Sequence, residues 1–155
     1  ALDAVIVTNK REIPADNFFS AAHGKQSTVL EQGEIVTRID LPARTSGATA
    51  GSFSAFRKLA FRKSIDFALV NCAAWLRFES GKIAAARICL NGVFNNPVRA
   101  TATEEFLIGK TLNMDIAEEA GIKALEGAKP LLSNYFKVPM SQAAVADCLM
   151  LCKAD

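Results

Sequence analysis

The sequence predicts an α+β fold, in which an antiparallel β-sheet of three to four strands is covered on one face by about three helices. Three strand-like runs follow one another between residues 53 and 90, and apolar residues alternate along two of them. Three helical segments then follow between residues 96 and 153. Strands followed by helices are typical of a sheet with its helices on one face. A smaller β-containing unit precedes this domain.

The strand prediction rests on alternation with a period of two. The run 67–79 and the run 82–90 are separated by Ser80-Gly81, which predicts a hairpin turn, and the run 53–61 comes before them. The alternate positions expected to face the core are Ala68, Val70, Cys72, Ala74, Leu76, Phe78, Ala84, Ala86, Ile88 and Leu90.

Start and stop signals divide the C-terminal part into helices over residues 97–108, 115–128 and 133–153. Asn96 followed by Pro97 is a typical N-cap and first helical residue. Asp115 with Glu118 resembles a capping box. Pro139 falls inside the third segment and predicts a kink or a break there, since proline has no N–H to donate.

Composition changes divide the chain into two units. Residues 43–51 are rich in Ala, Thr, Ser and Gly and are expected to be a linker. Residues 1–42 hold strand candidates at 5–7, 12–14 and 35–41 and a helical turn at 15–20, and residues 52–155 hold the α+β domain. Because the chain opens directly on a strand, we expect the rest of the first sheet to lie in a portion N-terminal to Ala1.

Composition also narrows the function classes. The net charge of +2 is too small to indicate binding to nucleic acid or to acidic membranes. No apolar run reaches the length of a membrane-spanning helix. Cys72, Cys89, Cys148 and Cys152 lie in apolar contexts without further ligands at metal spacing, so they are expected to be free thiols in the cytoplasm. His23, the single histidine, lies in a polar loop.

No autonomous catalytic centre is visible. Gly109-Lys110-Thr111 resembles the end of a phosphate-binding loop, but the upstream glycine is absent. The cations Arg57, Lys58, Arg62 and Lys63 either lie in solvent or face a phosphate-bearing cofactor. Gly92 after a strand predicts a positive φ or a close backbone approach, at a simple turn or at a ligand contact.

Five segments in order resemble the flavin (FAD) subunit, or medium chain, of molybdenum hydroxylases such as xanthine dehydrogenase and carbon monoxide dehydrogenase. They cover nearly the whole chain. The segments are Ile13-Pro14 with Asp16, Phe18 and Phe19; Leu30-Glu31-Gln32-Gly33-Glu34-Ile35-Val36 through Ile39, Leu41 and Pro42; Phe56-Arg57-Lys58 with Arg62, Asp66 and Val70; Ala86-Arg87-Ile88-Cys89-Leu90-Asn91-Gly92-Val93; and Pro97-Val98-Arg99-Ala100 with Glu104, Leu107 and Gly109.

The resemblance implies that residues 1–42 are a C-terminal remnant of an FAD-binding domain and that residues 52–155 form the C-terminal domain of the same subunit. It implies an oxidoreductase in which electrons pass from molybdopterin through [2Fe-2S] clusters to FAD. The molybdenum-binding subunit and the [2Fe-2S] subunit would be the partners, and they would carry those two cofactors. This chain alone would be catalytically incomplete, because the Gly-rich loops for the pyrophosphate are not in it.

The resemblance places two FAD contacts in this chain, Val36 and Lys58, with Arg57 as the alternative to Lys58. The loop 59–66 would lie beside the flavin. The usual Gly-Gly of the family is Asn91-Gly92 here. A non-enzymatic binding or assembly module of the same fold is the alternative function, and nucleic-acid binding through the four cations is a third hypothesis, distinguished by salt dependence.

Overall fold

The computed structural model describes residues 1–20, 27–43, 51–62 and 65–152. It contains two antiparallel sheets, which confirms the predicted α+β class. The first has the strand order β2-β1-β3, formed by β1 (Val5–Thr8), β2 (Glu12–Pro14) and β3 (Val36–Asp40). The second has the order β4-β5-β6-β7, formed by β4 (Ser52–Leu59), β5 (Val70–Glu79), β6 (Lys82–Asn91) and β7 (Val98–Arg99).

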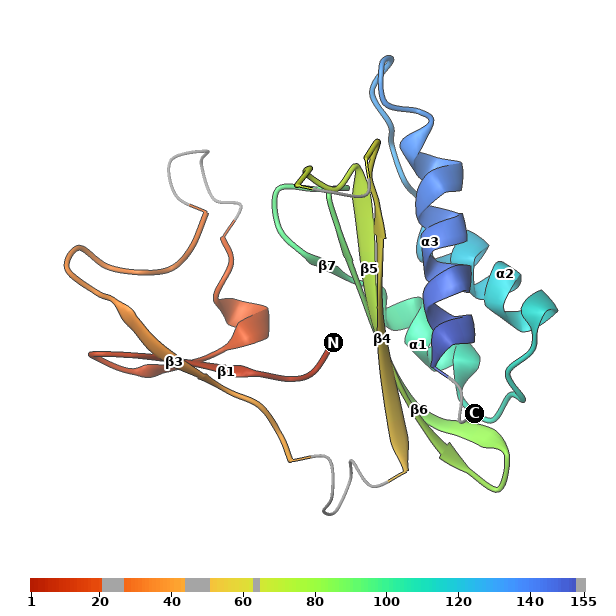
Figure 1. The fold of residues 1–155 in the computed structure, drawn as a ribbon, viewed down its shortest axis with the longest axis horizontal. Helices are drawn as coiled ribbons and strands as arrows, with labels where there is room; N and C mark the ends of the chain where they lie inside the picture. The colour runs from red at the N-terminus through yellow and green to blue at the C-terminus, as the bar shows by residue number, and fades with distance from the viewer. Residues whose placement is uncertain (21–26, 44–50, 63–64, 153–155) are drawn as a thin grey trace.

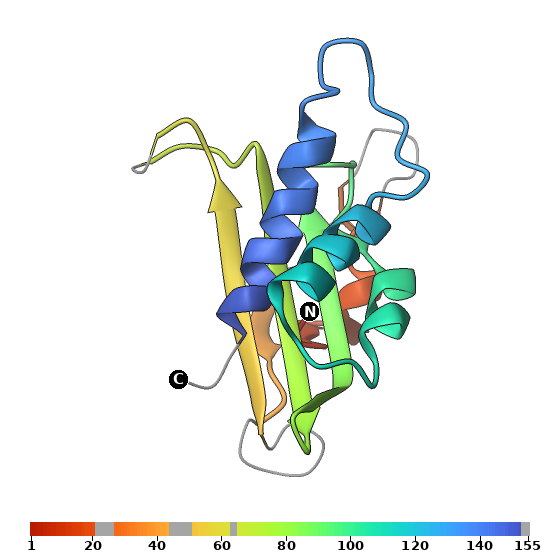
Figure 2. The same cartoon turned by 90° about the vertical axis from the view of Figure 1, so that its right-hand side faces the viewer.

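Helices cover one face of the four-stranded sheet (Figure 2). They are α1 (Thr101–Leu107), α2 (Met114–Ala124) and α3 (Lys137–Leu151), and a short 3-10 helix, η1 (Ala15–Asn17), lies in the first unit. In Figure 1 the four-stranded sheet stands between the helices on one side and the three-stranded sheet on the other. The face of the larger sheet that has no helices therefore turns toward the N-terminal part of the chain.

The predicted alternation holds along β5, where Val70, Cys72, Ala74 and Leu76 are all buried against the helices. Along β6 the pattern shifts at its start. Ile83 is buried instead of Ala84, since the register moves between Arg77 and Phe78 and leaves Ala84 without a partner in the ladder. Such a bulge turns the following side chains to the opposite face. Residues 67–69 precede the strand, which begins at Val70.

The expected helix start at Asn96-Pro97 is wrong. Val98 and Arg99 instead form β7 and pair with Leu90 and Cys89 at the sheet edge. The N–H of Ala100 then donates to the carbonyl of Ile88 at 3.0 Å, and α1 begins at Thr101. Proline before a short edge strand costs no ladder hydrogen bond, so the same residues serve a strand equally well.

Two further helix details differ from the prediction. The N-cap of α2 is Asn113, whose Oδ1 accepts the N–H of Ile116 at 2.8 Å, and Asp115 lies in the first turn instead. Pro139 does not break α3, because the helix begins at Lys137 rather than at residue 133. Its missing N–H falls in the first turn, where no intrahelical acceptor is due. The predicted ends at residues 128 and 153 are also too late, since α2 ends at Ala124 and α3 at Leu151.

The two sheets have separate apolar cores. The larger core lies between the four-stranded sheet and the helices, and the smaller one gathers Ile6, Ile13 and Phe18 within residues 1–42. We call residues 1–42 the first unit and residues 52–152 the second unit. The predicted linker at 43–51 falls mainly on residues 44–50, outside the described part of the chain, so the domain boundaries stay a prediction.

Candidate functional site

The face of the four-stranded sheet that has no helices, here called the outer face, carries polar and aromatic side chains in four rows. Residues paired across an antiparallel ladder point to the same side, so the register defines these rows. The rows are Ser52, Arg77, Ala85; Ser54, Trp75, Arg87; Phe56, Ala73, Cys89, Arg99; and Lys58, Asn71, Asn91.

Lys58 lies at one end of the outer face. Its ammonium donates to the main-chain carbonyl of Asp66, and among the described residues it forms no ion pair with a carboxylate. The carboxamides of Asn71 and Asn91 lie in the same row, and Phe56, with 59% of its surface exposed, lies two residues away on the same face. A cation, amide groups and an exposed aromatic ring together suit a planar ligand with carbonyl oxygens along one edge.

Arg57 points to the opposite face. Its Nε lies 3.1 Å from the carboxylate of Asp147 on α3, so its charge is paired on the helix side of the sheet. Arg62 pairs with Asp66 at 3.3 Å, and Lys63 lies outside the described residues. The basic cluster of the sequence is therefore not one cationic face. The geometry favours Lys58 over Arg57 as the residue facing the first unit, and its contact with a flavin stays a prediction.

The turn at Asn91-Gly92 adjoins this row and confirms the prediction for Gly92. Gly92 has φ +80°, and a Cβ there would stand 2.8 Å from the carbonyl oxygen of Leu69. The Asn91 side chain accepts the N–H of Gly92 at 2.8 Å. Both predicted reasons for glycine, a positive φ and a close approach of two backbones, therefore apply.

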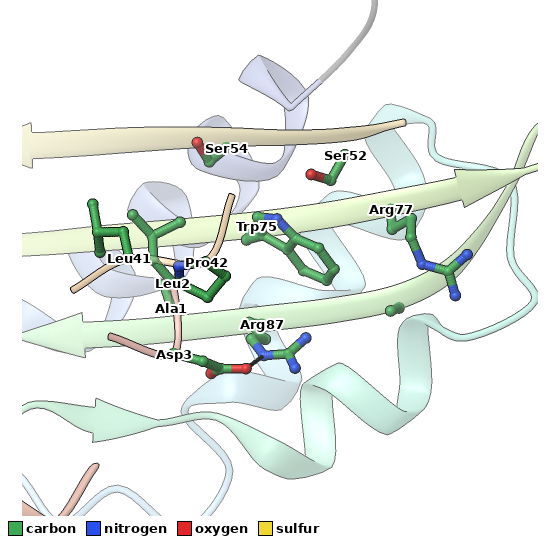
Figure 3. Close-up of a pocket in the computed structure, with 11 residues that line it drawn as sticks. Ala1, Leu2, Asp3, Leu41, Pro42, Ser52, Ser54, Trp75, Arg77 and Arg87 are labelled. Carbon is green, nitrogen blue, oxygen red and sulfur yellow. Dashed lines mark ion pairs between the residues drawn. The ribbon is translucent and has the colours of Figure 1, made fainter. Parts of the chain in front are cut away.

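A pocket of about 460 Å³ lies at the other end of the outer face, where the first unit approaches the sheet (Figure 3). The ring of Trp75 forms its floor together with the guanidinium of Arg87, which lies 4.8 Å from the ring centroid. Leu2, Leu41 and Pro42 of the first unit line the opposite wall. A local sequence pattern could not reveal this pocket, because the residues of its floor and those of its opposite wall are about 30 to 85 positions apart in the chain.

Acidic side chains of the first unit meet arginines of the outer face. Asp3 pairs with Arg87, as Figure 3 shows, and also lies 3.7 Å from Arg99. Asp16 accepts from Arg99 at 3.2 Å. Arg99 also donates twice to Glu104, at 2.5 Å and 3.1 Å, and these hydrogen bonds raise the pKa of its guanidinium.

Val36, the second predicted site residue, lies on the other sheet. Its side chain is half-buried against the small core of Ile6, Ile13 and Phe18, and its backbone pairs with Thr8 of β1. None of the hydrogen bonds of the described residues joins Val36 to Lys58. The structure therefore puts the two predicted contacts on different units.

The buried carboxylate of Glu34 supports the turn before Val36, and no local sequence pattern predicts its burial. The Glu34 side chain is fully covered and accepts from Arg11 at 2.9 Å and 3.0 Å, from Thr8 at 2.8 Å and from the N–H of Glu31 at 2.8 Å. These hydrogen bonds, led by those from Arg11, lower the pKa of Glu34 to about 2. Gly33, with φ +73°, allows the tight turn. The network fixes the entry into β3.

The thiols lie on the helix side of the sheet, away from the outer face, except Cys89. Cys148 donates weakly to the carbonyls of Ala55 and Cys72, and all four cysteines are free. Burial raises the pKa of Cys89 and that of Cys152, the latter to about 12. Within the described residues no three His, Cys, Asp or Glu side chains gather as a metal site, and no helix is long and apolar enough to cross a membrane.

Comparison with known proteins places this fold in a family. The family described as CO dehydrogenase flavoprotein C-terminal domain matches residues 54–137, more than half of the chain. The glyceraldehyde dehydrogenase medium chain of Sulfolobus acidocaldarius is 28% identical over 134 residues, which cover 84% of this chain and 44% of that protein. The nicotine 6-hydroxylase medium subunit of Paenarthrobacter nicotinovorans is 33% identical over 122 residues, covering 77% of this chain and 40% of that protein.

A solved structure matches the whole arrangement. It is a carbon monoxide dehydrogenase from Hydrogenophaga pseudoflava that lacks the Mo-pyranopterin moiety of its molybdenum cofactor. Its matching chain is 29% identical, with a TM-score of 0.82 over 98% of this chain and 53% of that chain. The chain spans less than half the length of the two curated relatives.

Proposed function

This chain belongs to the family of CO dehydrogenase flavoprotein C-terminal domains, and from this premise we propose that it is part of the FAD subunit of a molybdenum-containing hydroxylase. In this role it helps to position FAD for electron transfer from iron–sulfur clusters to an acceptor. The observation that carries the proposal is Lys58, which lies on the outer face and has no carboxylate partner for its ammonium among the described residues. No comparable observation in the described residues favours the alternative function, a non-enzymatic assembly module.

The outer face fits one part of FAD. The isoalloxazine is a planar ring system with carbonyl oxygens and ring nitrogens at one edge, and Lys58 with Asn71 and Asn91 offers donors in one row. The exposed ring of Phe56 offers a stacking surface beside them. The pyrophosphate has no counterpart, since no Gly-rich turn opens a helix in the described residues. That part of the site belongs to a different segment of the subunit.

Bound FAD would supply the redox chemistry, and this chain would bind and orient it. Lys58 would hold the polar edge of the ring by a charge-assisted hydrogen bond. Its positive charge would also favour negative charge on that edge, and thereby raise the reduction potential. Val36 on β3 would contact the cofactor from the opposite side, and the loop 59–66 would border the ring.

Residues 1–42 are the remnant of the FAD-binding domain and residues 52–155 the C-terminal domain, joined by the linker 43–51. The molybdenum-binding subunit and the [2Fe-2S] subunit are the partners and carry molybdopterin and the iron–sulfur clusters. Four free thiols support a cytoplasmic location. The medium-chain names of the relatives support an assembly of several subunits.

Flavin titration tests the proposal. FAD is added to the chain and to a polypeptide extended by about 150 upstream residues, roughly one domain, and flavin fluorescence and absorbance are followed. The extended polypeptide is expected to bind one FAD with quenched fluorescence, and the chain alone weakly. If neither retains FAD, the flavin role is excluded and the assembly-module function is the one left.

A further inference from the structure

The two units are joined by charge rather than by a common core. Their apolar clusters are separate, and the most extensive packing between strands and helices falls within each unit. In the described part of the chain, three ion pairs cross between the units: Asp3 with Arg87, Asp3 with Arg99, and Asp16 with Arg99. Every one of them ends on an arginine of the outer face.

Glu104 holds the guanidinium of Arg99 in place without any contribution from the first unit. Two hydrogen bonds from its guanidinium to Glu104 form a fork, and the same carboxylate accepts the N–H of Ile88 at 2.8 Å. Glu104 is only 12% exposed, so the pair is fixed on the second unit itself. A guanidinium held in this way loses little further freedom when a second carboxylate binds. This distinguishes it from an ordinary exposed ion pair.

We propose that Asp3, Asp16, Arg87, Arg99 and Glu104 form an electrostatic clasp that sets the orientation of the first unit over the outer face, with Arg99 as the positioning residue. The clasp joins the first unit, whose strand β3 carries Val36, to the sheet that carries Lys58. It therefore also sets the width of the space for the flavin. That consequence, unlike the clasp itself, rests on the proposed function.

Trp75 is a built-in reporter of the clasp. It is the single tryptophan of the chain, is 7% exposed, and lines the pocket between the units opposite Leu2 and Leu41. If the first unit moves away, the indole becomes accessible to water and to a quencher. Its emission and its quenching by acrylamide then measure the orientation of the units without any flavin.

The variants are Asp16→Asn and Asp3→Asn/Asp16→Asn, and the matched control is Asp147→Asn. Asp147 is a comparable carboxylate, paired with Arg57 at 3.1 Å on the helix face, and it does not join the units. We expect a red shift of Trp75 emission and a several-fold rise in its quenching constant in the double variant, with a smaller change in Asp16→Asn. Asp147→Asn should behave as the unmodified chain, and added salt should reproduce the effect in the unmodified chain.

Equal quenching in the clasp variants and in Asp147→Asn, with circular dichroism showing all of them folded, overturns the clasp. In the extended polypeptide, the clasp variants are expected to release FAD several-fold faster than the control. If they open the units but release FAD at the control rate, the effect on the cofactor is overturned. If the unmodified polypeptide binds no FAD at all, the proposed function fails while the Trp75 measurement still decides the clasp.

Discussion

At the scale of single residues, Lys58 and Arg57 are neighbours in sequence with opposite surroundings. Lys58 donates to a main-chain carbonyl on the outer face, whereas Arg57 is paired with Asp147 on the helix face. A strand turns successive side chains to opposite sides, so one position decides which cation faces the first unit. This gives a matched pair of substitutions for the flavin site.

Lys58→Met in the extended polypeptide is expected to weaken FAD binding about ten- to a hundredfold, since a hydrogen bond from a charged group contributes about 1.5–3 kcal/mol. It should also lower the flavin reduction potential, because a positive charge beside the ring is lost. Arg57→Met is the control and should leave FAD binding unchanged. Fluorescence titration and redox titration measure the two effects. A larger loss in Arg57→Met than in Lys58→Met would assign the contact to Arg57.

The structural role of a residue could be predicted from the sequence where it depends on neighbouring residues alone. The positive φ and close approach at Gly92 follow from a glycine at the end of a strand, and the structure confirms both. The burial of Glu34 could not be predicted, because its partner Arg11 lies 23 residues away across a loop. In the same way, the sequence around Arg99 does not predict its ion pairs with Asp3 and Asp16, since those contacts depend on how the two units pack together.

At the scale of elements, alternation and turn signals predicted the order of strands and helices, while the ends depended on partners. Asn96-Pro97 starts either a helix or an edge strand, and the ladder with β6 selects the strand. Asn113 and Asp115 are both good caps, and the bond to Ile116 shows that the helix uses the first. Pro139 breaks a helix only beyond its first turn, so its effect depends on where α3 begins.

The packing of α2 on α3 depends on Gly121. A Cβ at this position would lie 2.4 Å from the carbonyl oxygen of Gln142 in α3, which is closer than any real contact. Helix propensity alone predicts that Gly121→Ala stabilises by about 1 kcal/mol. Overpacking against a backbone costs about 1–3 kcal/mol.

We therefore expect Gly121→Ala to lower the free energy of unfolding by up to about 2 kcal/mol, because the cost of overpacking outweighs the gain in helix propensity. Urea unfolding followed by the helix signal in circular dichroism measures the change. The sign itself is the test, because propensity and packing predict opposite directions. A variant more stable than the unmodified chain would mean that the two helices separate at no cost and that the close approach is unimportant.

At the scale of the whole molecule, the two cores are of very different size. The second unit buries a large apolar cluster between sheet and helices, whereas the first depends on a few side chains around Ile6, Ile13 and Phe18. A unit of about 40 residues rarely buries enough surface to be stable without further support. The network of Arg11, Glu34 and Thr8 is positioned to give that support.

The first unit should therefore be lost in acid before the second. The pKa of Glu34 is lowered to about 2 in the folded chain from an ordinary value of 4.5, mainly by its hydrogen bonds from Arg11. Its contribution to stability is thus complete above pH 4.5, where the unfolded carboxyl is also ionised, and is lost as the pH falls toward about 2.

Amide signals of β1 and β3 in two-dimensional NMR should fade between pH 4.5 and about 2 while those of β5 and β6 persist. Glu34→Gln should lose them at neutral pH and respond little to acid, whereas Glu12→Gln, an exposed carboxylate 3.9 Å from Arg38, should titrate as the unmodified chain does. Simultaneous loss of both sets of signals would instead make the chain one cooperative unit, with the interface between the units as strong as either core.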